Sequence, residues 1–110
     1  MNQINRRVVV TGLGAISPVG NDVKTSWDNL VSGVHGIGPI TRFDTTEYKA
    51  KLAAEVRNFD ARQYMEKAET LRSDLYAQYA LASACQAVEE SGIMGTVDPE
   101  RFAVYFGSGI

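Results

Sequence analysis

The chain has 110 residues, of which 45% are hydrophobic and 22% are charged, and its formal net charge is -2 at pH 7. A chain of this length builds one modest core, and its ordinary composition excludes a disordered or low-complexity protein. Eleven lysines and arginines against thirteen aspartates and glutamates leave no basic excess, so we expect no nucleic-acid partner.

The cysteine count and the hydropathy pattern indicate a reducing, aqueous compartment. The single cysteine, Cys85, has no partner for an internal disulfide, and no Cys/His cluster has metal-ligand spacing. The apolar run that begins at Val8 ends at Thr11, far short of the roughly 20 apolar residues that span a bilayer. We therefore expect a cytoplasmic protein with no metal and no membrane partner.

The first predicted elements are a strand, a loop and a helix. Val8–Val10 form a β-branched run typical of a strand that is covered on both faces in an α/β sheet. Residues 12–20 contain three glycines and a proline and predict a loop. A helix is predicted over residues 22–32, with Asn21 as its N-cap and Gly33 as its left-handed stop. Its apolar residues share one face, which we expect to be buried: Val23, Trp27, Leu30 and Val31.

Short elements follow. An extended piece is predicted around residues 54–56. Asp60 with Gln63 resembles a capping box that opens a helical turn through Tyr64.

The longest predicted element is a helix over residues 69–90, which ends at Ser91 and Gly92. Its wide apolar stripe predicts close packing against more than one neighbour. The stripe consists of Leu71, Leu75, Tyr79, Ala82, Cys85 and Val88, widened by Ala77, Ala80, Leu81, Ala84 and Ala87.

After this helix, residues 102–106 predict a second buried strand, and residues 107–110 form a turn at its end.

This order of elements predicts an α/β fold without an internal domain boundary. Two strands that are apolar on both faces have too few partners in this chain to cover them. The sequence also stops one residue after a Gly-Ser-Gly turn. We therefore expect residues 1–110 to be the opening part of a larger domain, and to be marginally stable or prone to aggregate alone.

Neither candidate for nucleophilic or acid–base chemistry has a suitable environment. Cys85 lies deep in the long predicted helix, nearer its negative end, which disfavours a thiolate and favours a buried core residue. His35, the one imidazole, is predicted in a flexible surface loop. No nucleophile and base can be paired, so we expect no catalytic residue in this chain and no covalent acyl transfer by it alone.

The Gly12-Leu13-Gly14 motif suggests the opening of a dinucleotide-binding fingerprint. However, Ser17 stands where the third glycine belongs, and Pro18 keeps a helix from beginning there. A tight loop, in which the glycines allow positive φ and close backbone packing, is favoured. A NAD-binding module remains a remote alternative.

A charged stretch opens the long predicted helix, and its spacing indicates a solvated face. The stretch comprises Glu66, Lys67, Glu69, Arg72 and Asp74.

Residues 7–20, Arg-Val-Val-Val-Thr-Gly-Leu-Gly-Ala-Ile-Ser-Pro-Val-Gly, resemble the opening of the β-ketoacyl-acyl-carrier-protein synthases, specifically the elongating synthase II type of type II fatty acid synthesis. The similarity continues in the family's order over nearly the whole chain. It includes Trp27, Leu30, Ser32-Gly33, Gly36-Ile37, Phe43-Asp44, Ala54-Glu55-Val56, Gln78-Tyr79-Ala80, Ser91-Gly92 and Gly107-Ser108-Gly109-Ile110.

The resemblance implies a thiolase-like fold with layered αβαβα architecture, of which this chain holds only the N-terminal part of the first half. It also implies a homodimer that uses no cofactor and takes acyl and malonyl groups from an acyl carrier protein. The family's reaction is a decarboxylative Claisen condensation. Its cysteine nucleophile and two histidines are expected downstream of Ile110.

Two sites are implied by the resemblance. Ile110 is similar to a side chain that borders the acyl pocket, and Lys67 and Arg72 match basic residues that bind the carrier protein. The sequence departs from the family at Ala68 and Leu71, where a basic side chain is common. Carrier docking is then weaker or relies on other cations, although Leu71 also fits the predicted buried stripe.

Within this resemblance three interpretations stay open. The chain is part of a catalytic synthase, a non-catalytic truncated remnant, or a ketosynthase-like subunit of the chain-length type that shapes a partner's pocket.

Overall fold

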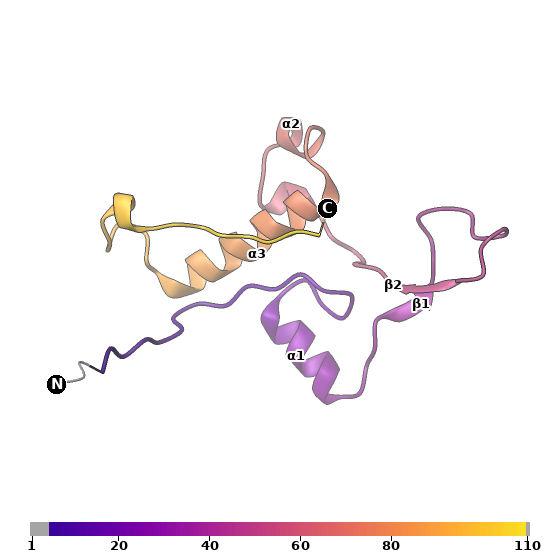
Figure 1. Cartoon of the computed structure of the whole chain (residues 1–110), viewed down its shortest axis with the longest axis horizontal. Coiled ribbons are helices and arrows are strands. Elements are labelled where there is room, and N and C mark those ends of the chain that lie inside the picture. Colours follow the sequence, from indigo (N-terminus) through magenta and orange to yellow (C-terminus); the bar gives the residue numbers. More distant parts are fainter. Residues whose placement is uncertain (1–4, 110) are drawn as a thin grey trace.

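The computed structural model describes residues 5–109 and has an elongated shape of 63 × 37 × 26 Å (Figure 1). Helix α3 lies along the middle, and Figure 1 shows the N-terminal and C-terminal segments both running along it. The described elements are α1 (Val23–Val31), β1 (Ile37–Pro39), β2 (Leu52–Ala54), the 3-10 turn η1 (Ala61–Gln63), α2 (Lys67–Thr70), α3 (Leu75–Ser91) and the 3-10 turn η2 (Pro99–Arg101).

Helix α1 forms almost where the sequence predicts it, but a different residue caps it. The carboxylate of Asp22 accepts from the backbone N–H of Thr25 (2.7 Å) and from its hydroxyl (2.8 Å), so Asp22 is the N-cap. The prediction of Asn21 as the cap is wrong, because its side-chain amide donates instead to the carbonyl of Arg57 (2.9 Å). Gly33 has φ +78° and follows the end of the helix, as predicted.

The predicted burial of the apolar face of α1 is wrong for the described residues. Trp27, Leu30 and Val31 are 66%, 58% and 68% exposed, and only Val23 is half-buried. The helix instead contacts the 17–20 turn through Ser26, which is 8% exposed. The Ser26 hydroxyl hydrogen-bonds to that of Ser17 (3.0 Å) and donates to the carbonyl of Gly20 (3.2 Å). Most of the apolar face is therefore exposed within residues 5–109, and only its first residue, Val23, is partly covered.

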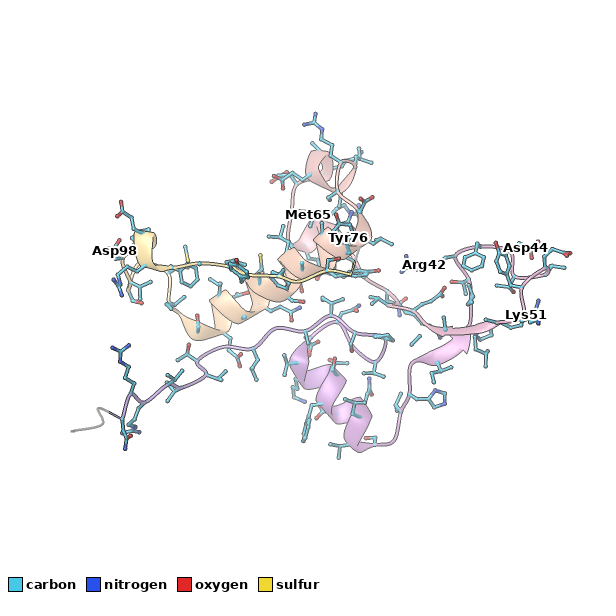
Figure 2. All side chains as sticks on the ribbon, in the orientation of Figure 1. Arg42, Asp44, Lys51, Met65, Tyr76 and Asp98 are labelled. Atoms are coloured by element: carbon cyan, nitrogen blue, oxygen red, sulfur yellow. The ribbon has the colours of Figure 1, made fainter. Side chains whose placement is uncertain are left out.

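Strands β1 and β2 pair antiparallel, with Ile37 opposite Ala54 and Pro39 opposite Leu52. The extended piece predicted at 54–56 therefore exists but lies two residues earlier in the chain. Figure 2 shows Asp44 and Lys51 on the arm that this hairpin forms, away from α3.

The long predicted helix is two helices, α2 and α3, with a break over residues 71–74. The buried side-chain amide of Gln78 explains the break, because its Nε2 donates to the carbonyls of Thr70 and Ser73 at 3.0 Å each. Because the Gln78 amide supplies their hydrogen-bond donor, these two carbonyls do not need the backbone N–H groups of a continuous helix. Gly92, with φ +61°, ends α3 as predicted.

The capping box also lies elsewhere than predicted. Glu66 and Glu69 form it at the start of α2. Asp60 caps η1, but it accepts from the backbone N–H of Arg62 (3.0 Å) instead of pairing with Gln63.

The two predicted buried strands are wrong for the structure as described. Residues 8–10 and 102–106 are in no strand, and Val8 and Tyr105 are 91% and 98% exposed. A strand needs a neighbour for its backbone hydrogen bonds, and neither segment has one within residues 5–109.

Candidate functional site

The glycine-containing loop lies directly on α3. A Cβ added to Gly12 would lie 2.1 Å from the carbonyl oxygen of Ala87, and one added to Gly14 would lie 1.9 Å from that of Ser83. Close backbone packing, as predicted from the sequence, is therefore why glycine is needed. Positive φ is not the reason, since neither glycine has it. Helix α1 begins only at Val23, so no helix N-terminus is available at these glycines to bind a pyrophosphate.

Gln86 holds this loop to α3 and to the η1 region. Its side-chain Oε1 accepts from the backbone N–H of Ala15 (3.1 Å), and its Nε2 donates to the carbonyl of Asn21 (2.7 Å) and to the Tyr64 hydroxyl (2.8 Å). The Leu13 N–H donates to the Glu90 carboxylate on the same helix. Partly buried networks of this kind fix one arrangement of the segments they join.

Aromatic rings extend the contact around η1. Phe59 stacks on Tyr64 with ring centroids 6.3 Å apart and meets Tyr79 of α3 edge to face at 5.0 Å. The Tyr79 hydroxyl accepts from Arg42 Nη2 (2.9 Å), and Figure 2 shows Arg42 between the β hairpin and α3. This hydrogen bond connects the β1–β2 hairpin to α3.

An apolar cavity of about 410 Å³ lies between the two extended segments and α3. No ionisable side chain of the described residues lines it, so it can hold apolar groups but cannot transfer a proton. Its lining residues are Val10, Thr11, Gly12, Gly14, Ser83, Ala84, Ala87, Val88, Ser91, Ile93, Phe102, Ala103, Val104 and Phe106.

The two predicted carrier-binding cations both lie at α2. Lys67 is the first residue of the helix, and Arg72 follows its C-cap, Leu71. Both cations are exposed, and neither forms an ion pair with the rest of the described chain. Arg62, close by in sequence, is instead paired with Asp60 at 3.0 Å, and this hydrogen bond lowers the pKa of the Asp60 carboxyl.

Leu71 does not belong to the buried stripe in which the sequence placed it. The side chain is 79% exposed because Leu71 ends α2 and precedes the break, so it cannot share the face of α3. Behind it, Arg72 borders a groove of about 340 Å³ lined also by Met65, Ala77 and Leu81. Met65 and Tyr76 lie near the start of α3 (Figure 2).

The remaining candidates stay apart from one another. Cys85 is partly buried in α3, whereas the sequence predicted a fully buried core position, and His35 is exposed in the loop after α1, as predicted.

Residues 5–109 contain no group of three His, Cys, Asp or Glu side chains that could hold a metal. No helix in that range is long and apolar enough to cross a bilayer. Ile110, the predicted acyl-pocket residue, lies outside the described residues.

Gln78 and Gln86, which hold segments around α3 together, were not predicted from the sequence. A signal was present in the sequence, because each of the two amides has an alanine as its neighbour on the alanine-rich helix α3. A polar side chain at such a position has to find hydrogen-bond partners when it is buried.

Residues 5–110 match the family described as Beta-ketoacyl synthase, N-terminal domain, and the chain belongs to this family. It is 46% identical over 107 residues to 3-oxoacyl-[acyl-carrier-protein] synthase 2 of Staphylococcus aureus (strain COL), and 46% identical over 106 residues to the protein of the same name from Vibrio cholerae serotype O1. Each match covers 96% of this chain and 26% of the relative, so the chain spans about a quarter of the length of these relatives.

A solved structure supports the same assignment. The chain superposes on one titled "The ishigamide ketosynthase/chain length factor" with a TM-score of 0.69 and 35% sequence identity, covering 83% of this chain and 23% of the other. The fold is therefore that of the N-terminal part of a ketosynthase, consistent with the predicted thiolase-like architecture. The resemblance read from residues 7–20 is confirmed.

Proposed function

We propose that this chain is part of a β-ketoacyl-acyl-carrier-protein synthase, an acyltransferase that elongates acyl chains in fatty acid synthesis. The supporting observation is the 46% identity to two bacterial 3-oxoacyl-[acyl-carrier-protein] synthase 2 proteins over 96% of this chain. In this proposal a malonyl-carrier thioester loses CO₂, and the resulting carbanion attacks an acyl thioester held on the enzyme.

The described residues contribute scaffold and docking surface, and not the reacting groups. The half-buried Cys85 and the exposed His35 lie on different elements and do not form a nucleophile–base pair. The family's cysteine and two histidines are accordingly assigned to other polypeptide of the same protein. The Gln86 network, which holds the glycine loop on α3, then serves to keep the first layer of that protein in place.

The proposed partner is an acidic acyl carrier protein, which Lys67 and Arg72 contact. Both cations are exposed and free of ion pairs within residues 5–109, so they are available to carboxylates of a partner. We further propose that Ile110 borders the acyl pocket, that the protein works as a homodimer in the cytoplasm, and that it needs no cofactor.

Turnover by the natural full-length protein tests the proposal. Purified protein is incubated with acyl-carrier protein and malonyl-carrier protein, and the 3-oxoacyl product and released CO₂ are measured. We expect product from the full-length protein and none from the 110-residue chain alone. Condensation product formed by the 110-residue chain alone would refute this division of roles.

A second candidate is a ketosynthase-like subunit of the chain-length type. It is favoured by one observation, the 35% identity to a solved structure whose title names a chain length factor beside a ketosynthase. Mass spectrometry after incubation with acyl-carrier protein separates the two candidates. A catalytic synthase gains the mass of the acyl group, whereas a chain-length subunit stays unmodified.

A further inference from the structure

We propose that residues 66–73 form a hinged flap that opens from α3 as one unit, and that the Gln78 side chain is the latch that holds this flap closed. The flap is a conformational device of the fold and does not depend on the proposed function. The carrying observation is that the Gln78 amide, in a side chain only 8% exposed, donates to the carbonyls of Thr70 and Ser73 at 3.0 Å each. Both acceptors belong to the flap, whereas the donor belongs to α3.

The other hydrogen bonds of the flap are internal. The backbone N–H of Thr70 donates to the carbonyl of Glu66 (3.1 Å), and that of Ser73 donates to the carbonyl of Glu69 (3.0 Å). The carboxylates of Glu66 and Glu69 form the capping box of α2, which also lies inside the flap. Because these bonds do not reach α3, they stay intact or break together when the flap leaves α3.

The two ends of the flap meet at its base. The Ser73 hydroxyl donates to the sulfur of Met65 over 3.8 Å. The chain is held in place on both sides of the flap, since the Tyr64 hydroxyl accepts from Gln86 (2.8 Å) and α3 begins at Leu75. The flap is therefore a compact loop with close ends between two fixed points, which is the geometry of a unit that moves as a whole.

A groove separates part of the flap from α3. Its volume is about 340 Å³, and Figure 1 shows α2 at the tip of a loop that projects from α3. Atoms that face an unfilled groove lose packing contacts on that side, so the Gln78 hydrogen bonds supply closure that packing does not. The groove is lined by Met65, Glu69, Arg72 and Ser73 on the flap side and by Ala77 and Leu81 on α3.

Opening of the flap should also unfold α2. This helix has four residues, and an isolated helix shorter than about 12 residues is marginal in water. The backbone amides of the flap should then exchange with solvent together. They should do so at a lower free energy than the amides around Ala82 in the middle of α3, where the side chain is 0% exposed.

Hydrogen–deuterium exchange of the natural full-length protein, read by mass spectrometry of peptides, tests this proposal. Exchange of residues 66–73 is compared with that of residues 82–88 over a range of urea concentrations below the unfolding transition. Gln78→Leu removes the latch. Gln86→Leu is the matched control on the same helix, because Gln86 donates to Asn21 and Tyr64, which lie outside the flap.

We expect exchange of residues 66–73 to be nearly independent of urea, because a local opening exposes little surface, and exchange of residues 82–88 to rise with urea. Gln78→Leu should speed exchange of residues 66–73 about tenfold or more, and Gln86→Leu should leave it unchanged. Exchange of residues 66–73 that rises with urea in parallel with that of residues 82–88 would overturn the proposal without any variant. An unchanged rate in folded Gln78→Leu, or an equal acceleration by Gln86→Leu, would overturn it as well.

Discussion

Replacing Gly14 with alanine tests how closely the loop approaches α3. The added Cβ would lie 1.9 Å from the Ser83 carbonyl oxygen and 2.8 Å from its carbonyl carbon. Both are backbone atoms in the middle of a helix, so they cannot move aside as the end of a flexible side chain can. Ordinary contact begins near 3.4 Å, and the loop must therefore retreat by about 1.5 Å.

The expected loss of stability follows from this retreat. Overpacking of this kind costs about 1–3 kcal/mol. The movement also stretches the hydrogen bond from Ala15 N–H to Gln86, now 3.1 Å, and the one from Leu13 N–H to Glu90. Each is worth about 1 kcal/mol. We expect Gly14→Ala to lower the free energy of unfolding by about 3–5 kcal/mol, a large part of a typical domain's stability.

Urea unfolding of the natural full-length protein, followed by circular dichroism, measures this loss. Gly33→Ala is the matched control, because Gly33 has φ +78° and no atom within 4 Å of the added Cβ. Its cost is conformational only and should be about 1–2 kcal/mol. A loss of stability for Gly14→Ala no larger than that for Gly33→Ala would contradict the close contact between Gly14 and Ser83.

Three further predictions concern single side chains. Gln78→Leu leaves the carbonyls of Thr70 and Ser73 without their donor and should cost about 1–3 kcal/mol in urea unfolding, and an unchanged midpoint would contradict the role of the amide. Two hydrogen bonds lower the pKa of the Asp22 carboxyl, the larger effect coming from the Thr25 backbone N–H and the smaller from the Thr25 hydroxyl. The contribution of Asp22 to folding stability is therefore present above its ordinary pKa of 3.8 and is lost as the pH falls through the lower folded-state pKa. Asp22→Ala should therefore cost about 1 kcal/mol at neutral pH, and this difference should shrink as the pH is lowered below 3.8 in circular-dichroism melts, whereas a constant difference would rule the ionised cap out. Cys85→Ala in the full-length protein should leave acyl-enzyme formation intact, and loss of the acyl mass from a folded variant would show that Cys85 is the nucleophile.

Local signals predicted those parts of the fold that depend on local chemistry. The end of α1 near Gly33, the cap of η1 by Asp60 and the end of α3 at Gly92 all follow from residue type at one position. The break between α2 and α3 was not predictable from periodicity, because it depends on where the Gln78 amide donates. Likewise, residues 8–10 and 102–106 have strand-like sequences, but pairing depends on neighbours that a local pattern does not specify.

The candidate site was predicted in part for the same reason. Lys67 and Arg72 came from a family resemblance, and their exposure agrees with a docking role, which itself remains to be tested. Leu71 was misplaced because the predicted helix was continuous, which put it on the stripe shared with Leu75. Once the helix breaks, the same residue becomes the exposed end of α2.

Gln78 consequently connects the stability of α3 with the orientation of the proposed docking surface at Lys67 and Arg72. Its amide donates to Thr70, the last residue of α2, and so fixes that helix and Leu71 beside it relative to α3. A Gln78 variant that still folds should weaken carrier binding although Gln78 itself is buried and contacts no partner. Carrier affinity that survives Gln78→Leu while Lys67→Glu lowers it would mean that α2 keeps its position through other contacts, such as that between Met65 and Ser73.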